Sequence, residues 1–366
     1  MWGFFHFPNY VRSSQSLFNY YMSKNLQAGV VGASGYSGIE LLRLLSGHPH
    51  IDVSVATSRK LVGQPVEQAY PVLRGRMGGL VFSDSEPTSL AATNDVDVFF
   101  LALPHGVASE YARPLYDAGR VVIDLSADFR LSSAETYKAY YGTEHPDLEL
   151  LEAGSYVIPE IHGMDGLSDH RLFACPGCYP TSIQVPLTPL LKGNLVSTDG
   201  IVVNSFSGVS GAGKKLSADY LYCERDGSAV AYGLPRHRHL SEIEEQLSKA
   251  AGQQVVLQFC PHLAPMQRGI ISTISVPGAG TLEDIYECWE AAYHGKPFVK
   301  LLPSGTFPDS KHVVGTNRVD ISAVLDDRTG RFLLTSAEDN LLKGASGQAI
   351  QIANLRFGFP ETAGLL

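Results

Sequence analysis

The chain has 366 residues, of which 44% are hydrophobic and 18% are charged, and its formal net charge is -9. This composition is that of an ordinary globular protein, and the length exceeds what one hydrophobic core usually serves, so two domains are expected. The acidic balance argues against non-specific nucleic-acid binding, which needs a basic face, and no apolar run is long enough to span a membrane.

The cysteines and the N-terminal segment bear on the cellular compartment. Five cysteines are dispersed over the chain, an odd number that does not suit a secreted disulfide framework and that favours a reducing, cytoplasmic setting. Residues 1–25 contain no acidic side chain and no apolar core followed by a cleavage-like site, which argues against a secretory signal. We interpret them as an N-terminal extension upstream of a start at Met22. A transit peptide is the alternative, disfavoured because Arg12 and Lys24 are its only basic residues besides histidine.

The first expected strand is Leu26–Val31, and it leads into a glycine-rich turn and then a helical pattern. This order predicts a dinucleotide site, because glycines let the backbone approach a pyrophosphate and the helix start attracts its charge. A plain strand–helix connection is the alternative. The predicted cofactor contacts in the turn are Gly32, Ser34, Gly35, Tyr36, Ser37 and Gly38.

The second expected strand, Ile51–Ala56, indicates which nicotinamide cofactor is used. An NAD site usually ends this strand with an acidic residue that binds the ribose hydroxyls. Here the strand is followed by Thr57-Ser58-Arg59-Lys60, which offers hydroxyls and two cations suited to a 2′-phosphate. We therefore predict NADP(H), held in part by Ser58 and Arg59. A solvated basic loop is the alternative.

Further strands are expected at Val96–Leu103 and Val121–Leu125, with a helix near 107–116 between them. Alternating strands and helices predict a parallel sheet with right-handed crossovers. The segments Leu103–Gly106 and Asp124–Arg130 then lie at the carboxyl edge of this sheet, where such folds hold ligands. Some of their polar residues are expected to hold turns.

The middle of the chain carries the most reactive candidate. The apolar run Leu172–Ala174 predicts a buried strand, Pro176-Gly177 predicts a sharp turn, and a helical pattern begins at Tyr179. Cys178 therefore lies where a helix starts, and unpaired N–H groups and the helix dipole favour thiolate over thiol there. We predict that Cys178 is a nucleophile. A pair of buried structural cysteines is the alternative.

After this helix the pattern changes to longer strands and hairpins, which predicts an α+β domain with a mostly antiparallel sheet. The loop after the first of these strands is rich in Ser and Gly and ends in two lysines, so it can cradle an oxyanion or a phosphate. A mobile loop is the alternative. Its candidate ligands are Ser207, Ser210 and Lys215. The strand patterns cover Gly200–Phe206, Val255–Phe259, Gly269–Val276, Val319–Val324 and Phe332–Thr335.

A tight cluster, Arg236-His237-Arg238-His239, precedes a helix for which Ser241 and Glu244 predict a capping box. Two histidines one residue apart could ligate a metal, but no third ligand cluster supports this, and we predict no metal site. One of the two histidines could instead act as a general acid or base if the fold brings it near the cysteine.

Taken in order, Gly32–Gly38, Pro176–Thr181 and His237–Ile243 resemble the N-acetyl-gamma-glutamyl-phosphate reductase family, within the wider semialdehyde dehydrogenase superfamily. The segments Pro261–Gly269 and Lys343–Ala349 add to the resemblance, which covers about residues 26–365. It implies that Cys178 is the nucleophile, that His237 is the acid/base, and that Asn317 lies on the cofactor side of the cleft. Weaker candidates for substrate binding are His239, Glu242 and Arg268.

The resemblance also implies an activity: NADPH-dependent reductive dephosphorylation of N-acetyl-gamma-glutamyl phosphate to N-acetyl-L-glutamate 5-semialdehyde, through a cysteine thioester, in arginine biosynthesis. It implies a homodimer or homotetramer. The expected domains are a Rossmann-like NADP-binding domain (26–177, completed by a helix in 340–366) and a catalytic and dimerisation domain (178–339). The fold class is therefore α/β with an added α+β domain.

Two departures from the family pattern and several rival functions remain. Cys175 stands where the family usually has Asn, and we hypothesise that it forms a reversible, inactivating disulfide with Cys178. The segment Tyr156–Glu160 also departs from the usual pattern. The alternatives are a carrier-linked aminoadipyl-phosphate reductase, an aspartate-semialdehyde dehydrogenase, a thiol–disulfide oxidoreductase and a non-catalytic NADP-binding regulator.

Overall fold

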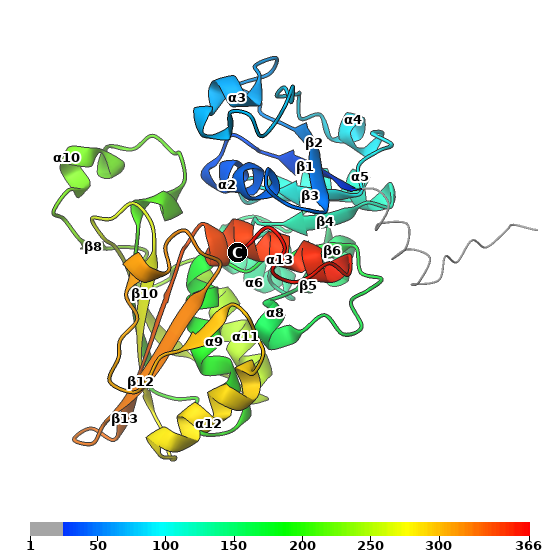
Figure 1. Cartoon of the computed structure of the whole chain (residues 1–366). Helices are drawn as coiled ribbons and strands as arrows, with labels where there is room; N and C mark the ends of the chain where they lie inside the picture. The colour runs from blue at the N-terminus through cyan, green and yellow to red at the C-terminus, as the bar shows by residue number, and fades with distance from the viewer. Residues whose placement is uncertain (1–24) are drawn as a thin grey trace, which may run out of the picture.

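The computed structural model describes residues 25–366, so the segment predicted as an N-terminal extension lies almost wholly outside the described range. Two sheets organise the chain, one in each half, and Figure 1 shows them side by side with the C-terminal helix between them. This arrangement confirms the predicted fold class, a parallel α/β unit joined to a unit with a mostly antiparallel sheet.

The first sheet has six parallel strands in the order β2-β1-β3-β4-β6-β5. Short apolar runs form its centre because both faces are covered by helices, and β3 and β4 are buried along their whole length. The strands are β1 (Leu26–Val31), β2 (Ile51–Ala56), β3 (Val98–Leu101), β4 (Val121–Asp124), β5 (Ser155–Tyr156) and β6 (Leu172–Ala174). The helices are α2 (Tyr36–Leu45), α3 (Val66–Ala69), η1 (Pro71–Leu73), α4 (Pro87–Ala91), α5 (Ala108–Asp117), α6 (Ala134–Tyr141), α7 (Leu148–Ala153) and α8 (Pro159–His162).

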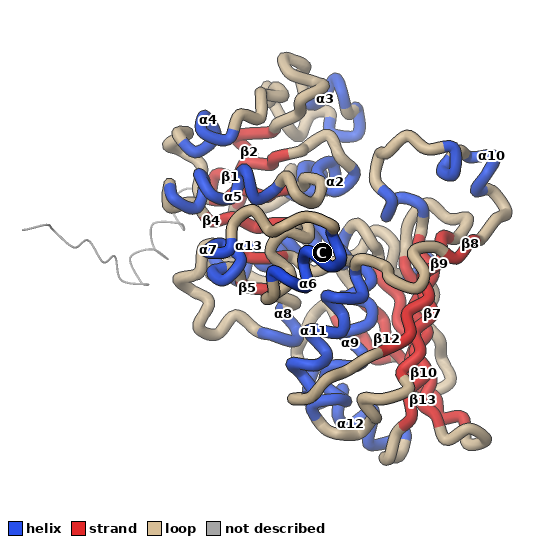
Figure 2. Tube along the Cα trace, turned by 180° about the vertical axis from the view of Figure 1, so that it is seen from behind, coloured by secondary structure: helices blue, strands red, loops and turns tan. Residues whose placement is uncertain are grey.

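The second sheet has seven strands in the order β11-β12-β13-β10-β7-β9-β8. Its longer strands alternate buried and partly exposed residues, because helices cover only one face (Figure 2). The strands are β7 (Ile201–Ser207), β8 (Val230–Ala231), β9 (Leu257–Leu263), β10 (Ile270–Pro277), β11 (Val299–Leu301), β12 (Val319–Asp326) and β13 (Arg331–Glu338). The helices are α9 (Cys178–Lys192), η2 (Val209–Ala212), η3 (Ala218–Tyr220), α10 (Tyr222–Arg225), α11 (His239–Ala251), α12 (Leu282–Tyr293), η4 (Ser310–His312), η5 (Leu342–Ser346) and α13 (Gly347–Arg356).

The chain returns to the first half at its C-terminal end. The π-helical turn η5 leads into α13, which packs Ile350, Ile352 and their small neighbours into the core of the parallel sheet. α9 crosses between the two halves, since its first residue follows β6 closely and its later turns enter the core of the second sheet. The start of α9 is therefore enclosed by both halves.

One local prediction is wrong. Ser241 and Glu244 form no capping box, because α11 already begins at His239. Its N-cap residue is Arg238, whose side chain makes no capping hydrogen bond. Ser241 Oγ instead donates to Arg238 O at 3.0 Å, and Glu244 accepts from Leu257 N at 3.1 Å. His239 is thus the first residue of the helix, whereas His237 lies before it.

Candidate active site

Cys178 is the first residue of α9, directly after the turn that ends β6. Gly177 is the N-cap and supplies no side chain, so the first amides of the helix keep their donors for other partners. No acidic residue occupies the first turn. A nucleophile placed here has N–H groups beside it that can hold an oxyanion formed at the carbon it attacks.

Burial makes this cysteine a protonated thiol in the free protein. Desolvation raises the pKa of Cys178 to about 12, and the Tyr179 N–H offsets this rise only in part. The prediction that the helix start favours the thiolate is therefore wrong for the unliganded protein, because desolvation outweighs the helix terminus. The thiol has to lose its proton during the reaction.

A buried ion pair fixes the turn that presents the nucleophile. Glu242 accepts hydrogen bonds from Gly177 N (2.9 Å) and Tyr156 OH (2.8 Å), and its other oxygen lies 3.3 Å from Arg130 Nη1. Arg130 Nε donates to Cys175 O at 2.8 Å. Both charged side chains are buried, and each neutralises the other. Glu242 was a candidate for substrate binding, but its hydrogen bonds all go to the protein, where they support this turn.

Two histidines pack against Tyr179, the residue after Cys178. The ring centroids of His237 and His239 lie 5.6 Å and 6.0 Å from that of Tyr179, and the two imidazoles are 5.0 Å apart. Gly233, at φ +65°, leaves room for this packing, since a Cβ there would fall 2.8 Å from His237 Cδ2. The fold therefore brings the two predicted catalytic residues to the same corner of the molecule.

The protonation of His237 follows from its surroundings. Burial and the Arg238 cation lower the pKa of His237 to about 4, so the ring is neutral at pH 7. Its Nδ1 accepts a hydrogen bond from the His239 N–H at 3.1 Å, which assigns the hydrogen of the neutral ring to Nε2. The resting ring therefore presents an N–H donor, and taking up a proton at Nδ1 breaks its backbone contact.

The surroundings of the histidines are strongly cationic. Burial, Arg238 and Arg130 together lower the pKa of His105 to about 4. Burial also lowers the pKa of His239 well below 6.5, and His237 and the same arginines act in the same direction. Arg130 is already paired with Glu242, so the cation that favours an anionic ligand beside these three neutral imidazoles is Arg238.

The glycine-rich turn after β1 fits a dinucleotide. Gly32 has φ +81°, and a Cβ there would lie 2.4 Å from Ala102 O; a Cβ on Gly38 would lie 2.4 Å from Gly32 O. Gly35 caps α2 without a side chain, and no acidic residue stands in the first turn of α2. Uncapped amides at a close-packed helix start are the group of donors that a diphosphate needs.

The end of β2 fits a phosphorylated ribose. Ser58 Oγ donates to Ser34 Oγ at 2.8 Å, which joins this strand end to the glycine-rich turn. Arg59 is exposed, and its Nη2 donates to Tyr111 OH at 3.2 Å. With no carboxylate in 57–60, these residues suit the 2′-phosphate of NADP(H) better than the free ribose of NAD.

A lysine from the second half reaches the cofactor turn. Lys214 Nζ donates to Ser34 O at 2.8 Å and lies 5.3 Å and 5.1 Å from the ring centroids of Tyr36 and Tyr70. The candidate predicted from the sequence is the next lysine, Lys215, and both lysines are exposed. Because adjacent residues in a loop point in different directions, composition could not distinguish them.

Serines that were predicted as ligands hold the backbone of these loops. Ser207 Oγ donates to the carbonyl of the following residue at 3.1 Å, and Ser210 Oγ accepts from Asn340 Nδ2 at 3.0 Å. On the cofactor side, the carbonyl of Ser37 accepts from Ser346 Oγ at 2.8 Å. Ser207 and Ser210 are buried, so they shape the loop from within.

Arg268 and Asn317 also lie between the two halves. Arg268 is 2.9 Å from Asp339 and 2.9 Å from Glu40 of α2, so it links the second half to the cofactor helix. Asn317 Nδ2 donates to Gln351 Oε1 at 3.1 Å, whereas its buried Oδ1 has no partner among the described residues. An orphaned acceptor at this place fits a donor such as the carboxamide of a nicotinamide.

The residue pair Cys175 and Cys178 does not form a disulfide here, and all five cysteines are free. Cys175 lies in the core of the parallel sheet with its Sγ 3.4 Å from Ala345 O, whereas Cys178 packs against the core of the second sheet. Burial raises the pKa of Cys175 to about 12. Joining the two thiols would require the turn to rearrange, and the regulatory disulfide stays a prediction.

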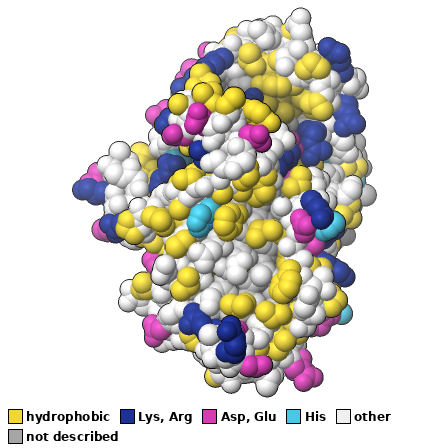
Figure 3. All heavy atoms as spheres, turned by 90° about the vertical axis from the view of Figure 1, so that its left-hand side faces the viewer, with side chains coloured by type: hydrophobic (Ala, Val, Ile, Leu, Met, Phe, Trp, Pro, Cys, Tyr) yellow, Lys and Arg dark blue, Asp and Glu magenta, His cyan; other side chains and the backbone are white. Residues whose placement is uncertain are grey.

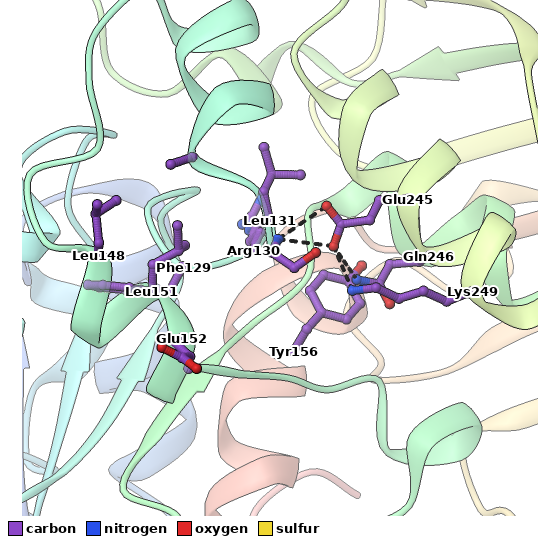
Figure 4. A pocket seen from close by; sticks show the side chains of 13 residues that line it. Phe129, Arg130, Leu131, Leu148, Leu151, Glu152, Tyr156, Glu245, Gln246 and Lys249 are labelled. Atoms are coloured by element: carbon purple, nitrogen blue, oxygen red, sulfur yellow. Dashed lines mark hydrogen bonds and ion pairs between the residues drawn. The ribbon is translucent and has the colours of Figure 1, made fainter. Parts of the chain in front are cut away.

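A cavity of about 480 Å³ lies between α6, α7 and α11 (Figure 4). Glu245 at its edge accepts from Ser132 N at 3.1 Å and from Lys249 Nζ at 2.7 Å, so Glu245 and Lys249 already neutralise each other. The nucleophile, the histidines and the glycine-rich turn do not line it. We assign no substrate to this cavity.

Residues 25–366 lack two further features, a membrane-spanning helix and a metal site. No helix there combines the length and apolar character needed to cross a bilayer. In the same residues no group of three or more His, Cys, Asp or Glu side chains is arranged to hold a metal ion.

Comparison with known proteins gives consistent matches over the whole described chain. Residues 27–167 match the NAD binding domain of semialdehyde dehydrogenase, and residues 178–340 match its dimerisation domain. Among solved structures, aspartate semialdehyde dehydrogenase with NADP from Candida albicans has a TM-score of 0.68 at 17% identity, covering 91% of this chain and 98% of that one. Aspartate semialdehyde dehydrogenase II from Vibrio cholerae has a TM-score of 0.67 at 17% identity, with the same coverage. These similarities show the fold.

Other relatives share a much higher sequence identity with the chain than these solved structures do. The chain is 50% identical over 345 residues to an N-acetyl-gamma-glutamyl-phosphate reductase of Akkermansia muciniphila, covering 93% of this chain and 99% of that one. It is 46% identical over 343 residues to the protein of the same name from Geobacter sp. strain M21, covering 93% and 98%. The chain therefore belongs to the N-acetyl-gamma-glutamyl-phosphate reductase family, within the semialdehyde dehydrogenases.

Proposed function

We propose that this protein reduces N-acetyl-gamma-glutamyl phosphate to N-acetyl-L-glutamate 5-semialdehyde with NADPH, releasing phosphate, a step of arginine biosynthesis. The observation that carries the proposal is a partly buried cysteine at an uncapped helix start, in the same corner as neutral imidazoles and the Arg238 guanidinium, which favours an anionic acyl phosphate. The names of relatives at up to 50% identity support the same substrate.

The residues divide the work as follows. Cys178 Sγ attacks the acyl carbon, the bond to the phosphate oxygen breaks, and a thioester remains. His237 takes up the thiol proton, and the amides at the start of α9 hold the oxyanion. NADPH, when bound, supplies the hydride that reduces the thioester. Breaking of the carbon–sulfur bond then releases the aldehyde, and His237 returns the proton to the sulfur.

Arg59 provides a test of the cofactor. Replacing Arg59 with alanine is expected to raise the KM for NADPH about tenfold and to leave the KM for NADH unchanged, because only NADPH carries the 2′-phosphate that a guanidinium can bind. Steady-state kinetics with both cofactors measures this. Arg328→Ala is the matched control, since Arg328 is also an exposed arginine but lies in the turn between β12 and β13 of the second half. Equal losses with NADPH and NADH would place Arg59 elsewhere than at the 2′-phosphate.

We propose a homodimer formed through the open face of the second sheet. That face carries alternate residues of its strands, among them Phe206, which is 38% exposed and stacks on His262 at 4.6 Å. Figure 3 views the molecule from this side and shows hydrophobic and uncharged side chains across the middle, with charged ones toward the margins. An uncovered sheet face of this kind is typical of a subunit interface. The face consists of Val202, Asn204, Phe206, Gln258, Cys260, His262, Ile271, Thr273, Ser275, Leu333 and Thr335.

Substitution of Phe206 tests this interface. Phe206→Asp is expected to convert the protein to monomers, because it places a charge in the desolvated centre of the contact. Sedimentation velocity measures the mass. Leu148→Asp on α7 is the matched control, since Leu148 is 60% exposed but lies in the other half. A Phe206→Asp protein with the mass of the wild type would exclude this face.

We also propose a cytoplasmic location. Five free cysteines, none paired in the described chain, support a reducing compartment. Measuring reductase activity in fractionated cells tests this, and activity confined to a membrane or organelle fraction would contradict it.

The assay that tests the proposed function runs the reaction backwards. Phosphate-dependent reduction of NADP⁺ is measured with N-acetylglutamate semialdehyde and, in parallel, with aspartate semialdehyde. We expect turnover with the first substrate alone. Turnover with aspartate semialdehyde would favour the rival member of the superfamily, and binding of NADP⁺ without turnover of either would favour a non-catalytic regulator.

A further inference from the structure

Glu338 is a buried carboxyl group without a partner. It is the last residue of β13, its exposed fraction is 0%, and neither carboxyl oxygen makes a hydrogen bond within residues 25–366. An unpaired buried carboxyl is unfavourable for folding, since it gives up its contacts with water and gains none in return. Such a group calls for a functional explanation.

The nearby charged residues already have other partners. Lys343 Nζ lies 2.7 Å from both oxygens of Glu160 and 2.8 Å from Gln351 Oε1. Asp339 is paired with Arg268. Because Lys343 is already neutralised by Glu160 and makes no ion pair with Glu338, it does not serve as the counter-ion of Glu338. Desolvation, together with the carboxylates of Asp339 and Glu160, keeps the pKa of Glu338 well above 4.5, although Lys343 opposes the rise.

The position of Glu338 relative to Cys178 follows from the strand. Leu334 and Ser336 precede it on the same face of β13, and Ser336 Oγ donates to Ser182 O, one turn further along α9 than Cys178. Glu338 therefore faces the first turn of α9. A Cβ on Gly344 would lie 3.0 Å from Glu338 Oε1 and 2.7 Å from Cys178 Cβ, so both groups converge on one point.

We propose that Glu338 is a positioning acid of the reaction: its neutral carboxyl donates a hydrogen bond to the sulfur of Cys178 when the thiol proton has left. A neutral carboxyl has one O–H donor, and a thiolate can accept it in addition to the hydrogen bond from the protonated His237 of the proposed mechanism. The absence of a partner in the resting protein then has a reason, since the acceptor exists only during the reaction. The proposal rests on the proposed role of Cys178 as nucleophile.

Two variants separate this role from a structural one. Glu338→Leu removes the donor and also the unpaired polar group. We therefore expect a higher melting temperature together with a loss of kcat of at least about tenfold. Glu338→Gln keeps an N–H donor and is expected to restore most of the lost kcat. Glu160→Leu is the matched control: Glu160 is equally buried but paired with Lys343, so its loss is expected to lower the melting temperature.

A second measurement does not depend on the substrate. The rate of alkylation of Cys178 by iodoacetamide, followed by mass spectrometry of its peptide, reports the thiolate directly. We expect slower alkylation in Glu338→Leu than in the wild type, with Glu338→Gln between them. Faster alkylation in both variants would mean that an ionised carboxylate repels the thiolate, and would overturn the proposal. Unchanged kcat, or parallel loss of kcat and stability in Glu338→Leu, would overturn it too.

The alkylation experiment also separates the two proposals. If the wild type shows no reductase activity, the proposed function fails, while the alkylation rates still test whether Glu338 stabilises the thiolate.

Discussion

Replacing Cys178 with serine is expected to lower the rate of aldehyde formation by at least about a thousandfold while leaving the Kd for NADPH unchanged. The hydroxyl occupies nearly the same volume, so the start of α9 keeps its shape. A serine oxygen, however, is far harder to deprotonate than a thiol, and the site already raises the pKa of the native thiol to about 12. The covalent step is thereby lost, and cofactor binding at the distant glycine-rich turn is not.

Steady-state kinetics measures the loss of turnover, and fluorescence titration with NADPH measures the Kd. Cys260→Ser is the matched control, because Cys260 is also a free, partly buried cysteine but lies on the open face of the second sheet. Near-normal turnover in Cys178→Ser would end the thioester mechanism. A burst of phosphate from the wild type, absent in the variant, would support it independently.

The sequence predicted the parts of the site that depend on local patterns. The position of Cys178 at a helix start could be predicted because Pro176-Gly177 interrupts an apolar run and a helical pattern follows, and such a turn positions a side chain regardless of the rest of the chain. The cofactor turn was found for the same reason, since Gly32 has the positive φ that its pattern implies. Strand and helix limits came within a few residues for most elements.

The rest depends on contacts between distant segments, which a single sequence does not display. Arg130 and Glu242 are 112 residues apart, and only the fold joins them beneath the turn of the nucleophile. The sequence does give one indication that Arg130 belongs to the site, because this residue ends a polar segment at the carboxyl edge of the predicted sheet. The sequence gives no such indication for Glu338, because a polar residue at the end of a strand is common. The protonation of Cys178 was mispredicted because helix position is local, while desolvation depends on packing from both halves.

His237→Ala is expected to lower kcat/KM about 100- to 10,000-fold, the usual range for loss of a general acid or base. The reason is that His237 is the proposed acceptor of the thiol proton, and burial lowers the pKa of His239, the other imidazole packed against Tyr179, well below 6.5. Added imidazole is expected to restore part of the rate, because removal of the ring leaves space beside Tyr179. Loss of less than tenfold, without a change in pH profile, would remove His237 from the mechanism.

The pH dependence makes the prediction specific. A base has to be neutral, and the pKa of His237 is lowered to about 4, so kcat/KM of the wild type should stay flat from neutral pH down to about pH 5 and fall only as pH approaches 4. A ring with the ordinary pKa of 6.5 would instead give a fall through pH 6.5. The same shift affects folding: the unfolded chain protonates first, so stability present above pH 6.5 is lost as the pH falls toward 4. Rates therefore have to be measured well below the melting temperature at each pH, and in His237→Ala the limb near pH 4 should disappear.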